Sequence, residues 1–248
     1  MRDQLVLCYH AVSDSWPASL SISAERFEEQ LTALLRRGYV PKTFSAAVRD
    51  GGNGRTLAVT FDDGYRSVIQ LALPVLSRLG APATVFVPTD FVGTGRPMSW
   101  PGIDRWLGGP HERELVPMDW DELRGLQDAG WEIGSHSRSH PRLTRVSDNE
   151  LSQELGSSRQ TLEERLGVPC RSIAYPYGDV DRRVARAAGA AGYEAGGGLA
   201  PYGLGARPLR WPRVGVYRED SDRRFALKVS RLARRVGLAR LRYPFSRS

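Results

Sequence analysis

The sequence predicts an α/β fold built on a parallel sheet, which is either open or closed into a barrel. Strand-like apolar runs alternate with helix-like runs along most of the chain, an order typical of βα units. A length of 248 residues is enough for one large domain or two small ones, and we expect a single catalytic domain over 1–248. Polar residues directly follow several strand-like runs, where parallel α/β barrels place their active sites.

The first half of the chain begins this alternation. Helices are expected over 24–37, with Ser23 as its N-cap and Gly38 as its stop, and over 65–79, with a kink at Pro74. Apolar runs predict three strands, over 4–10, 56–61 and 83–87. Residues 90–118 are rich in Gly, Pro and Trp and show little periodicity, so we interpret them as a long insertion of the kind that often forms a binding surface.

The second half continues the pattern to a basic end. A helix over 148–166 begins at Ser147, with Glu150 completing a capping box, and ends at Gly167. Two further helices are expected over 119–129 and 180–191, and four strands over 131–136, 171–176, 193–197 and 213–217. A basic helix and tail close the chain over about 222–248.

The charge is concentrated in this tail. Residues 222–248 hold nine Lys or Arg residues and one acid, Asp222, so they account for the whole net charge of +7. Neither a signal peptide nor an apolar stretch of about 18 residues is visible. The two cysteines, Cys8 and Cys170, are interpreted as free thiols in a reducing compartment, and we expect the protein to be cytoplasmic.

Several chemically active residues fall at predicted strand ends. His10 ends the first strand, Asp62 and Asp63 follow the second, and the sequence SHSRSH at the end of the strand over 131–136 supplies His136 and His140. Each feature alone has an ordinary structural explanation, since Asp-Gly pairs form turns and a lone histidine is usually packed. Together they indicate a site, because His-x-x-x-His on one helical turn places both imidazoles on one face.

These motifs resemble those of the polysaccharide deacetylases, the NodB-homology domain of carbohydrate esterase family 4. The resemblance rests on TFDDGY, SHSRSH followed by PRL, and AYPYG, and it extends from LCYHAV to PRVGVY. It implies a distorted (β/α)7 barrel of the NodB-homology type. It also implies metal-dependent hydrolysis of the N-acetyl group of an amino sugar.

The resemblance assigns roles to individual residues. Asp63, His136 and His140 become the ligands of one divalent ion, with zinc expected and cobalt, nickel or iron as alternatives. Asp62 becomes the general base, and the backbone N–H of Tyr177 completes the oxyanion site. Two His nitrogens and one carboxylate leave positions open for water and substrate, as a catalytic zinc requires.

The chain departs from the family pattern at two places. The late His motif that supplies the general acid is missing, because His140 is the last histidine. His10 is the substitute, as in a subgroup with permuted late motifs, while His111 is interpreted as a surface residue. Ala174 stands where many members carry an Arg, and either Arg213 orients Asp62 instead or Arg213 is a surface cation.

Other functions are weaker interpretations. A non-haem iron oxygenase would need a different ligand spacing and a jelly roll, and a nucleic-acid role for the tail lacks a motif. A non-catalytic carbohydrate-binding barrel, or a deacylase or deformylase acting on a non-polymeric or lipid-linked amide, stays as the alternative. The expected partner is an N-acetylated sugar, with Trp100, Trp106 and Trp120 either stacking on it or packing the insertion.

The apolar residues of the tail suggest a helix over 223–236. Phe225, Val229, Leu232 and Val236 fall on one helical face. This face either packs on the barrel while the cations are solvated, or it also contacts an anionic membrane through residues 237–248. The oligomeric state is not visible in the sequence.

Overall fold

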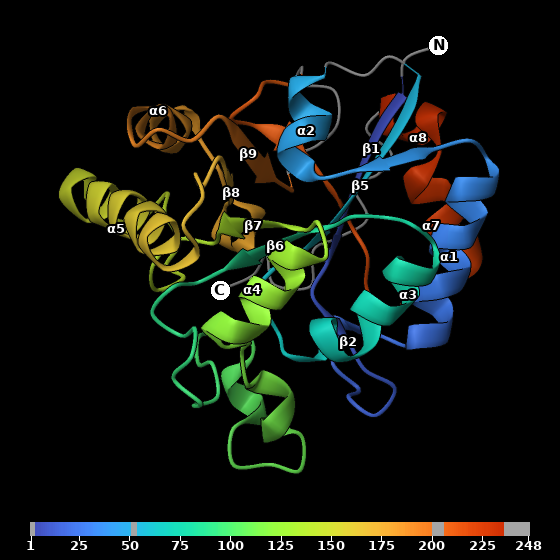
Figure 1. Ribbon diagram of the computed structural model, residues 1–248, viewed down its shortest axis with the longest axis horizontal. Helices are drawn as coiled ribbons and strands as arrows, with labels where there is room; N and C mark the ends of the chain where they lie inside the picture. Colours follow the sequence, from blue (N-terminus) through green and yellow to red (C-terminus); the bar gives the residue numbers. More distant parts are fainter. Residues whose placement is uncertain (1–2, 51–53, 200–205, 236–248) are drawn as a thin grey trace.

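A parallel β-barrel forms the centre of the molecule (Figure 1). The structure, a computed structural model, describes residues 3–50, 54–199 and 206–235. Within these residues the strands follow the order β10-β9-β8-β7-β6-β5-β1-β11. The path consists of β1 (Asp3–Tyr9), β5 (Arg55–Phe61), β6 (Thr84–Val87), β7 (Glu132–Ser135), β8 (Ser172–Ala174), β9 (Ala195–Gly198), β10 (Trp211–Pro212) and β11 (Val214–Gly215).

The last strand segment closes the barrel. β10 pairs with β9 and β11 pairs with β1, and both pairings are parallel. Only Arg213 separates these two short strands, so residues 211–215 serve as one seventh strand between β9 and β1. This arrangement confirms the (β/α)7 barrel. The last strand ends at Gly215, two residues before the predicted end, although the backbone N–H of Val216 still donates to the carbonyl of Cys8 at 2.9 Å.

Small and apolar side chains fill the inside of the barrel. Val6, Ala58, Phe86 and Ala174 form a core cluster with residues of α2 (Phe44–Arg49), a helix that the sequence pattern did not reveal. Phe44 meets Phe86 edge to face, with ring centroids 5.6 Å apart. This short helix therefore plugs the end of the barrel at which the strands begin (Figure 1).

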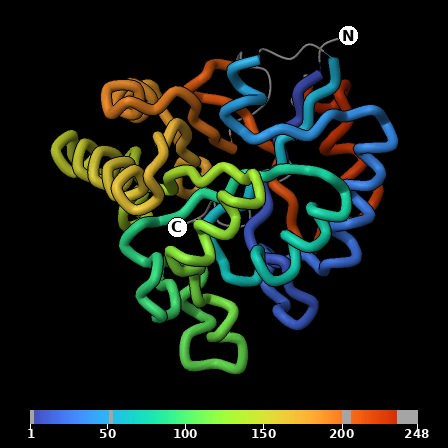
Figure 2. The backbone as a smooth tube through the Cα atoms, viewed as in Figure 1, coloured from blue at the N-terminus to red at the C-terminus, as the bar shows by residue number. Residues whose placement is uncertain are grey.

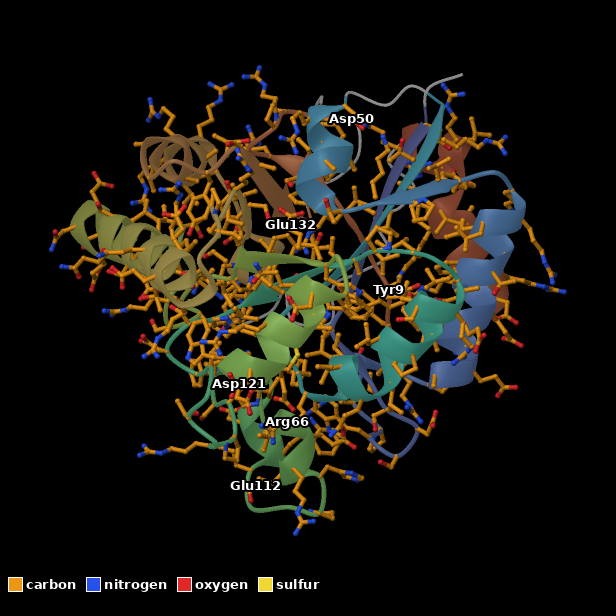
Figure 3. The ribbon with its side chains drawn as sticks, in the orientation of Figure 1. Tyr9, Asp50, Arg66, Glu112, Asp121 and Glu132 are labelled. Atoms are coloured by element: carbon orange, nitrogen blue, oxygen red, sulfur yellow. The ribbon has the colours of Figure 1, made fainter. Side chains whose placement is uncertain are left out.

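A carboxylate ties this plug to the sheet. Glu132, labelled in Figure 3, accepts a hydrogen bond from the backbone N–H of Ser45 at 2.9 Å. It also accepts from the hydroxyls of Thr84 and Ser172. The end at which the strands begin is thus fixed, and the opposite end is free to carry a site.

Four of the outer helices begin and end close to the predicted residues, namely α1 (Ala24–Arg36), α4 (Trp120–Asp128), α5 (Asp148–Leu166) and α6 (Arg182–Ala190). The other described outer helices, which differ from the prediction, are α3 (Leu73–Arg78), α7 (Asp222–Val229) and α8 (Arg231–Arg235). Ser23 caps α1, Ser147 and Glu150 form the predicted capping box of α5, and Gly167 ends α5 with φ 70°. Short strands complete the list: β2 (Ala11–Val12), β3 (Ser21–Ile22) and β4 (Val40–Lys42).

The expected helix over 65–79 is irregular before its proline. Residues Val68–Ala72 form a π-helical turn, and α3 starts at Leu73. Pro74 has no N–H to donate to the carbonyl four residues earlier. The backbone hydrogen bonds of this turn therefore span five residues instead of four. The distortion therefore lies one turn ahead of the predicted kink.

The prediction of a single helix over 223–236 was wrong. Ser230 has an extended backbone with ψ 135°, and this residue separates α7 from α8. Phe225 and Val229 are buried, but Leu232 is 74% exposed because the break turns it outward. Lys228 and Arg234 are buried rather than solvated. Lys228 forms a salt bridge with Asp220, and Arg234 forms one with Asp3. Val236 and the tail over 237–248 lie outside the described residues.

The insertion over 90–118 projects beyond the ends of the strands (Figure 2). It contains two 3₁₀ turns, η2 (Asp104–Trp106) and η3 (Glu112–Leu115), and Glu112 lies at its outer end (Figure 3). Its inner side is packed, with Met98, Trp100, Ile103 and Leu115 buried. Among the described helices, none combines the length and apolar character of a membrane span.

Candidate active site

The two neighbouring aspartates point in different directions. Asp62 follows β5 with both carboxylate oxygens on Arg213, whereas the Asp63 carboxylate faces His136 and His140. Asp63 has φ 70°, and Gly64 after it has φ 71°. This left-handed turn separates the carboxylates, which explains how two like charges tolerate adjacency at the end of a buried strand.

The two histidines come from one loop after β7. The predicted helical turn was wrong, since residues 136–140 form neither helix nor strand, and Ser137 and His140 have φ 63° and 64°. His136 Nδ1 lies 2.8 Å from the carbonyl oxygen of Ala174. A ring N–H donating to that carbonyl leaves Nε2 free to bind a ligand.

Three buried atoms converge as a group that could hold a metal ion. Asp63 Oδ1 lies 3.2 Å from His136 Nε2 and 3.4 Å from His140 Nε2. Tetrahedral zinc ligands about 2.0–2.1 Å from the ion lie about 3.3 Å apart. Asp63 Oδ1 is buried without a hydrogen-bond partner, so a cation would satisfy it. The residues present therefore fit the divalent ion that the resemblance implies.

The electrostatics of this group suit a cation. Burial would raise the pKa of Asp63, but the two imidazoles hold that pKa well below its usual range. Burial lowers the pKa of His140, which keeps its ring neutral. Burial also acts to lower the pKa of His136, but the charges of Asp62 and Asp63 outweigh it, so the pKa of His136 is raised. The same negative charge that attracts a proton to this ring would attract a metal ion.

Arg213 forms a two-point ion pair with Asp62. The distances are 2.6 Å from Nη1 to Oδ1 and 2.7 Å from Nη2 to Oδ2. Burial alone would raise the pKa of Asp62, but the Arg213 charge and hydrogen bonds lower it to about 2. Because Arg213 is only 3% exposed, the alternative of a surface cation was wrong.

Space for Arg213 comes from a glycine in β9. A Cβ on Gly197 would lie 2.8 Å from Arg213 Cδ. The guanidinium also donates to the hydroxyl of Thr60 and lies over the ring of Phe86. The side chain thus reaches Asp62 on the inside of the barrel from residues 211–215, which only β1 separates from β5.

His10 lies in the same pocket as the aspartates. Its ring, the Cys8 thiol and Asp62 each offer an atom within 4.8 Å of the others. His10 and Asp62 are therefore neighbours in the pocket. Burial lowers the pKa of His10, although the charges of Asp63 and Asp62 partly oppose this effect.

Tyr177 and the insertion cover the site. The Tyr177 ring lies 4.8 Å from the His140 ring, and Trp100 stacks on His140 with centroids 4.0 Å apart. Both rings line the pocket together with Pro101, Gly102 and Ile103. One face of Trp100 is therefore occupied by a protein ring. Trp106 packs on Trp16 and on His111, which is only partly exposed.

Backbone strain is concentrated here. Among the described residues, those other than glycine with positive φ are Asp63, Ser137, His140 and Tyr177. Such conformations cost free energy and persist where the surroundings impose them, often at active sites. This backbone feature unites the three sequence motifs.

Some residues of the site were not anticipated from the sequence. The thiol of Cys8 donates a hydrogen bond to Asp62 Oδ2, with Sγ and Oδ2 3.3 Å apart. Its place two positions before His10 puts it on the inner face of β1, which is the signal that could have revealed it. Glu154 on α5 accepts hydrogen bonds from the loop between the two histidines. The sequence gives no signal of this role, which becomes visible only in the folded chain.

The family model described as polysaccharide deacetylase matches residues 49–196. The chain belongs to the polysaccharide deacetylase family. The matched range contains Asp62, Asp63, His136, His140 and Tyr177, whereas His10 and Arg213 lie outside it. The family assignment and the three motifs therefore agree.

Curated proteins and solved structures show the same relationship. The Bacillus subtilis protein YxkH is 25% identical over 196 residues, which cover 77% of this chain and 62% of YxkH. The peptidoglycan-N-acetylglucosamine deacetylase PgdA of Listeria monocytogenes is 27% identical over 64% of this chain and 29% of its own length. The chain thus spans less than two thirds of these polysaccharide deacetylase relatives.

A solved relative shares the fold over nearly its whole length. The Streptococcus pyogenes deacetylase PplD has a TM-score of 0.76 and 20% identity, and the match covers 93% of this chain and 99% of PplD. At this identity the likeness shows the fold, which is the barrel of the polysaccharide deacetylases.

Proposed function

We propose that this chain is a metal-dependent carbohydrate deacetylase that hydrolyses the N-acetyl group of an N-acetylated amino sugar. One observation carries the proposal. Asp63 Oδ1 is buried without a hydrogen-bond partner between two imidazole nitrogens, and Asp62 and His10 lie in the same pocket. A ligand set, a base and an acid are therefore within reach of one substrate amide.

Asp63, His136 and His140 hold the divalent ion in this proposal. Zinc is the first choice because His₂-carboxylate sets are used by catalytic zinc, and cobalt, nickel or iron are the alternatives. When bound, the ion polarises the amide carbonyl and makes water a stronger acid. The His136 tautomer, fixed by Ala174 O, directs Nε2 toward it.

The remaining residues move protons. Asp62, ionised because Arg213 lowers its pKa to about 2, accepts a proton from the water that attacks the carbonyl carbon. The backbone N–H of Tyr177 donates to the carbonyl oxygen as it gains charge. His10 then donates a proton to the amine nitrogen as the C–N bond breaks, which releases acetate and the free amino sugar. Its lowered pKa makes protonated His10 a stronger acid toward this nitrogen.

The size of the pocket supports a small acyl group. Its volume is about 20 Å³, and Leu20 and Ile103 contribute apolar lining beside the ligands. A narrow pocket of this kind favours a short acyl group over a long one. Acetyl suits this pocket, and formyl is the alternative that a deformylase would use.

An acetate-release assay tests the function. Purified protein is loaded with zinc and given N-acetylated sugars of increasing size, including N-acetylglucosamine oligomers and an N-formyl analogue. We expect acetate release that stops with chelator and returns with zinc. Zinc-loaded protein that binds these sugars but releases no acid from any of them would support the non-catalytic binding barrel instead.

The tail carries a separate part of the proposal. Leu232 on α8 is exposed, and the sequence beyond it continues with Leu238, Leu241, Tyr243 and Phe245 among basic residues. We infer contact with an anionic membrane surface. Co-sedimentation with phosphatidylserine-containing vesicles should fall when residues 237–248 are removed, and equal binding by both forms would refute it. The cytoplasmic location stays a prediction.

A further inference from the structure

The loop that joins His136 to His140 has no regular secondary structure to satisfy its backbone. Residues 137–140 belong neither to a helix nor to a strand, and they are buried or half-buried. Buried N–H groups need acceptors, and leaving one without a partner costs about 1–3 kcal/mol. The acceptors in this loop therefore decide its shape.

Serine hydroxyls accept from the first and last of these N–H groups. Ser137 N donates to Ser135 Oγ at 3.1 Å, and His140 N donates to Ser137 Oγ at 3.1 Å. Both acceptors lie within the motif itself. They stabilise the left-handed conformations of Ser137 and His140, which turn the second imidazole back toward Asp63.

A single carboxylate accepts from the two middle N–H groups. Arg138 N and Ser139 N both donate to Glu154 Oε2 at 2.9 Å. Ser139 Oγ donates to Glu154 Oε1 at 2.6 Å. Glu154 comes from α5, outside the motif, and it is 5% exposed. A buried carboxylate is costly unless it is hydrogen-bonded, and here charge-assisted bonds stabilise it.

We propose that Glu154 is a positioning residue for the metal site. It holds the loop that sets the separation of His136 and His140, and so it sets the affinity for the divalent ion. This inference rests on the proposed function. Without the carboxylate, two adjacent N–H groups lose their acceptor, and the loop can relax from its left-handed turns. His140 Nε2 would then move from its place 3.4 Å from Asp63 Oδ1.

The affinity for zinc is the direct test. Apparent Kd values are measured by competition with a fluorescent zinc chelator, and the site geometry is followed through the d–d absorption of bound cobalt. Glu154→Ala should weaken zinc binding about 10- to 100-fold, the effect typical of residues that orient metal ligands, and alter the cobalt spectrum. Glu154→Gln should restore most of the affinity, because an amide oxygen can accept from both N–H groups.

Two matched variants separate positioning from general effects. Glu164→Ala removes an exposed carboxylate from the same helix, where its hydrogen bond is to Gln160. Arg138→Ala removes the guanidinium that lies 3.5 Å from Glu154 but keeps the backbone N–H. Both should bind zinc within about twofold of wild type.

The outcomes are distinct. Folded Glu154→Ala with the affinity of Glu164→Ala would overturn the inference. If Glu154→Ala does not fold, Glu154→Asp replaces it, since the shorter side chain keeps the charge but not the reach. Wild-type affinity in Glu154→Asp would overturn the inference, and weaker binding than Glu154→Gln would support it. Wild-type protein that binds no zinc would refute the proposed metal site itself.

Discussion

Arg213 binds both carboxylate oxygens of Asp62, from 151 residues further along the chain. The pair is buried on both sides, with side chains 0% and 3% exposed. Its two parallel bonds fix the plane of the carboxylate as well as its charge. This is the contact through which a residue outside the three motifs reaches the proposed base.

Removing the Arg213 charge should move the pH dependence of activity. Burial raises the pKa of Asp62 and Arg213 lowers it to about 2, so in Arg213→Met the pKa should rise. Asp62 would then be protonated over a wider acidic range, and the acidic limb of kcat/KM should move to higher pH. Arg213→Lys, which keeps the charge but not the two-point geometry, is the control and should move it less. An unchanged acidic limb in Arg213→Met would exclude Asp62 as the titrating base.

The two aspartates should separate catalysis from metal binding. Asp62→Asn should lower turnover by about 10² or more while zinc content stays near one per chain, because its carboxylate faces Arg213. Asp63→Asn should lower zinc affinity, because its Oδ1 lies between the imidazoles. Zinc content by elemental analysis and turnover by acetate release are measured on both. An exchange of these two phenotypes would reverse the assignment.

His10 should act in turnover without holding the metal. We expect His10→Ala to lower kcat by about 10² and to leave the zinc Kd within a few fold. The reason is that His10 groups with Cys8 and Asp62, whereas Asp63, His136 and His140 form the other group. Competition with a chelator measures the zinc Kd, and steady-state kinetics on the same preparation measures kcat. A large loss of zinc affinity would make His10 a ligand instead.

The buried lysine of α7 should stabilise the C-terminal helices. Lys228 Nζ lies 2.5 Å from Asp220 Oδ2 and donates to the carbonyl of Gly215, so it joins α7 to β11. Lys228→Met would leave the buried Asp220 carboxylate without this partner, and we expect a loss of about 3–5 kcal/mol in the free energy of unfolding. Urea denaturation measures this loss. Arg223→Met, on the exposed side of the same helix, is the control and should change it by less than about 0.5 kcal/mol.

The sequence by itself determined the class of the fold and the residues of the three motifs. Alternating strands and helices predicted the α/β class, and capping residues such as Ser147 and Gly167 placed the ends of α5. These features are readable because they depend on neighbours within a few residues. Asp62, Asp63, His136 and His140 stood out because they gather at the C-terminal ends of predicted strands.

Only the tertiary structure decided how these residues meet. The Asp62–Arg213 pair requires residues 211–215 to close the barrel between β9 and β1, a pairing of segments far apart in the chain. The same holds for Glu154 on α5, whose hydrogen-bond partners Arg138 and Ser139 lie in the loop after β7. The left-handed turn at His140 replaced the helical turn that the spacing suggested, and the break at Ser230 turned Leu232 outward. Local patterns report propensity, whereas these features depend on which distant groups satisfy buried N–H groups and charges.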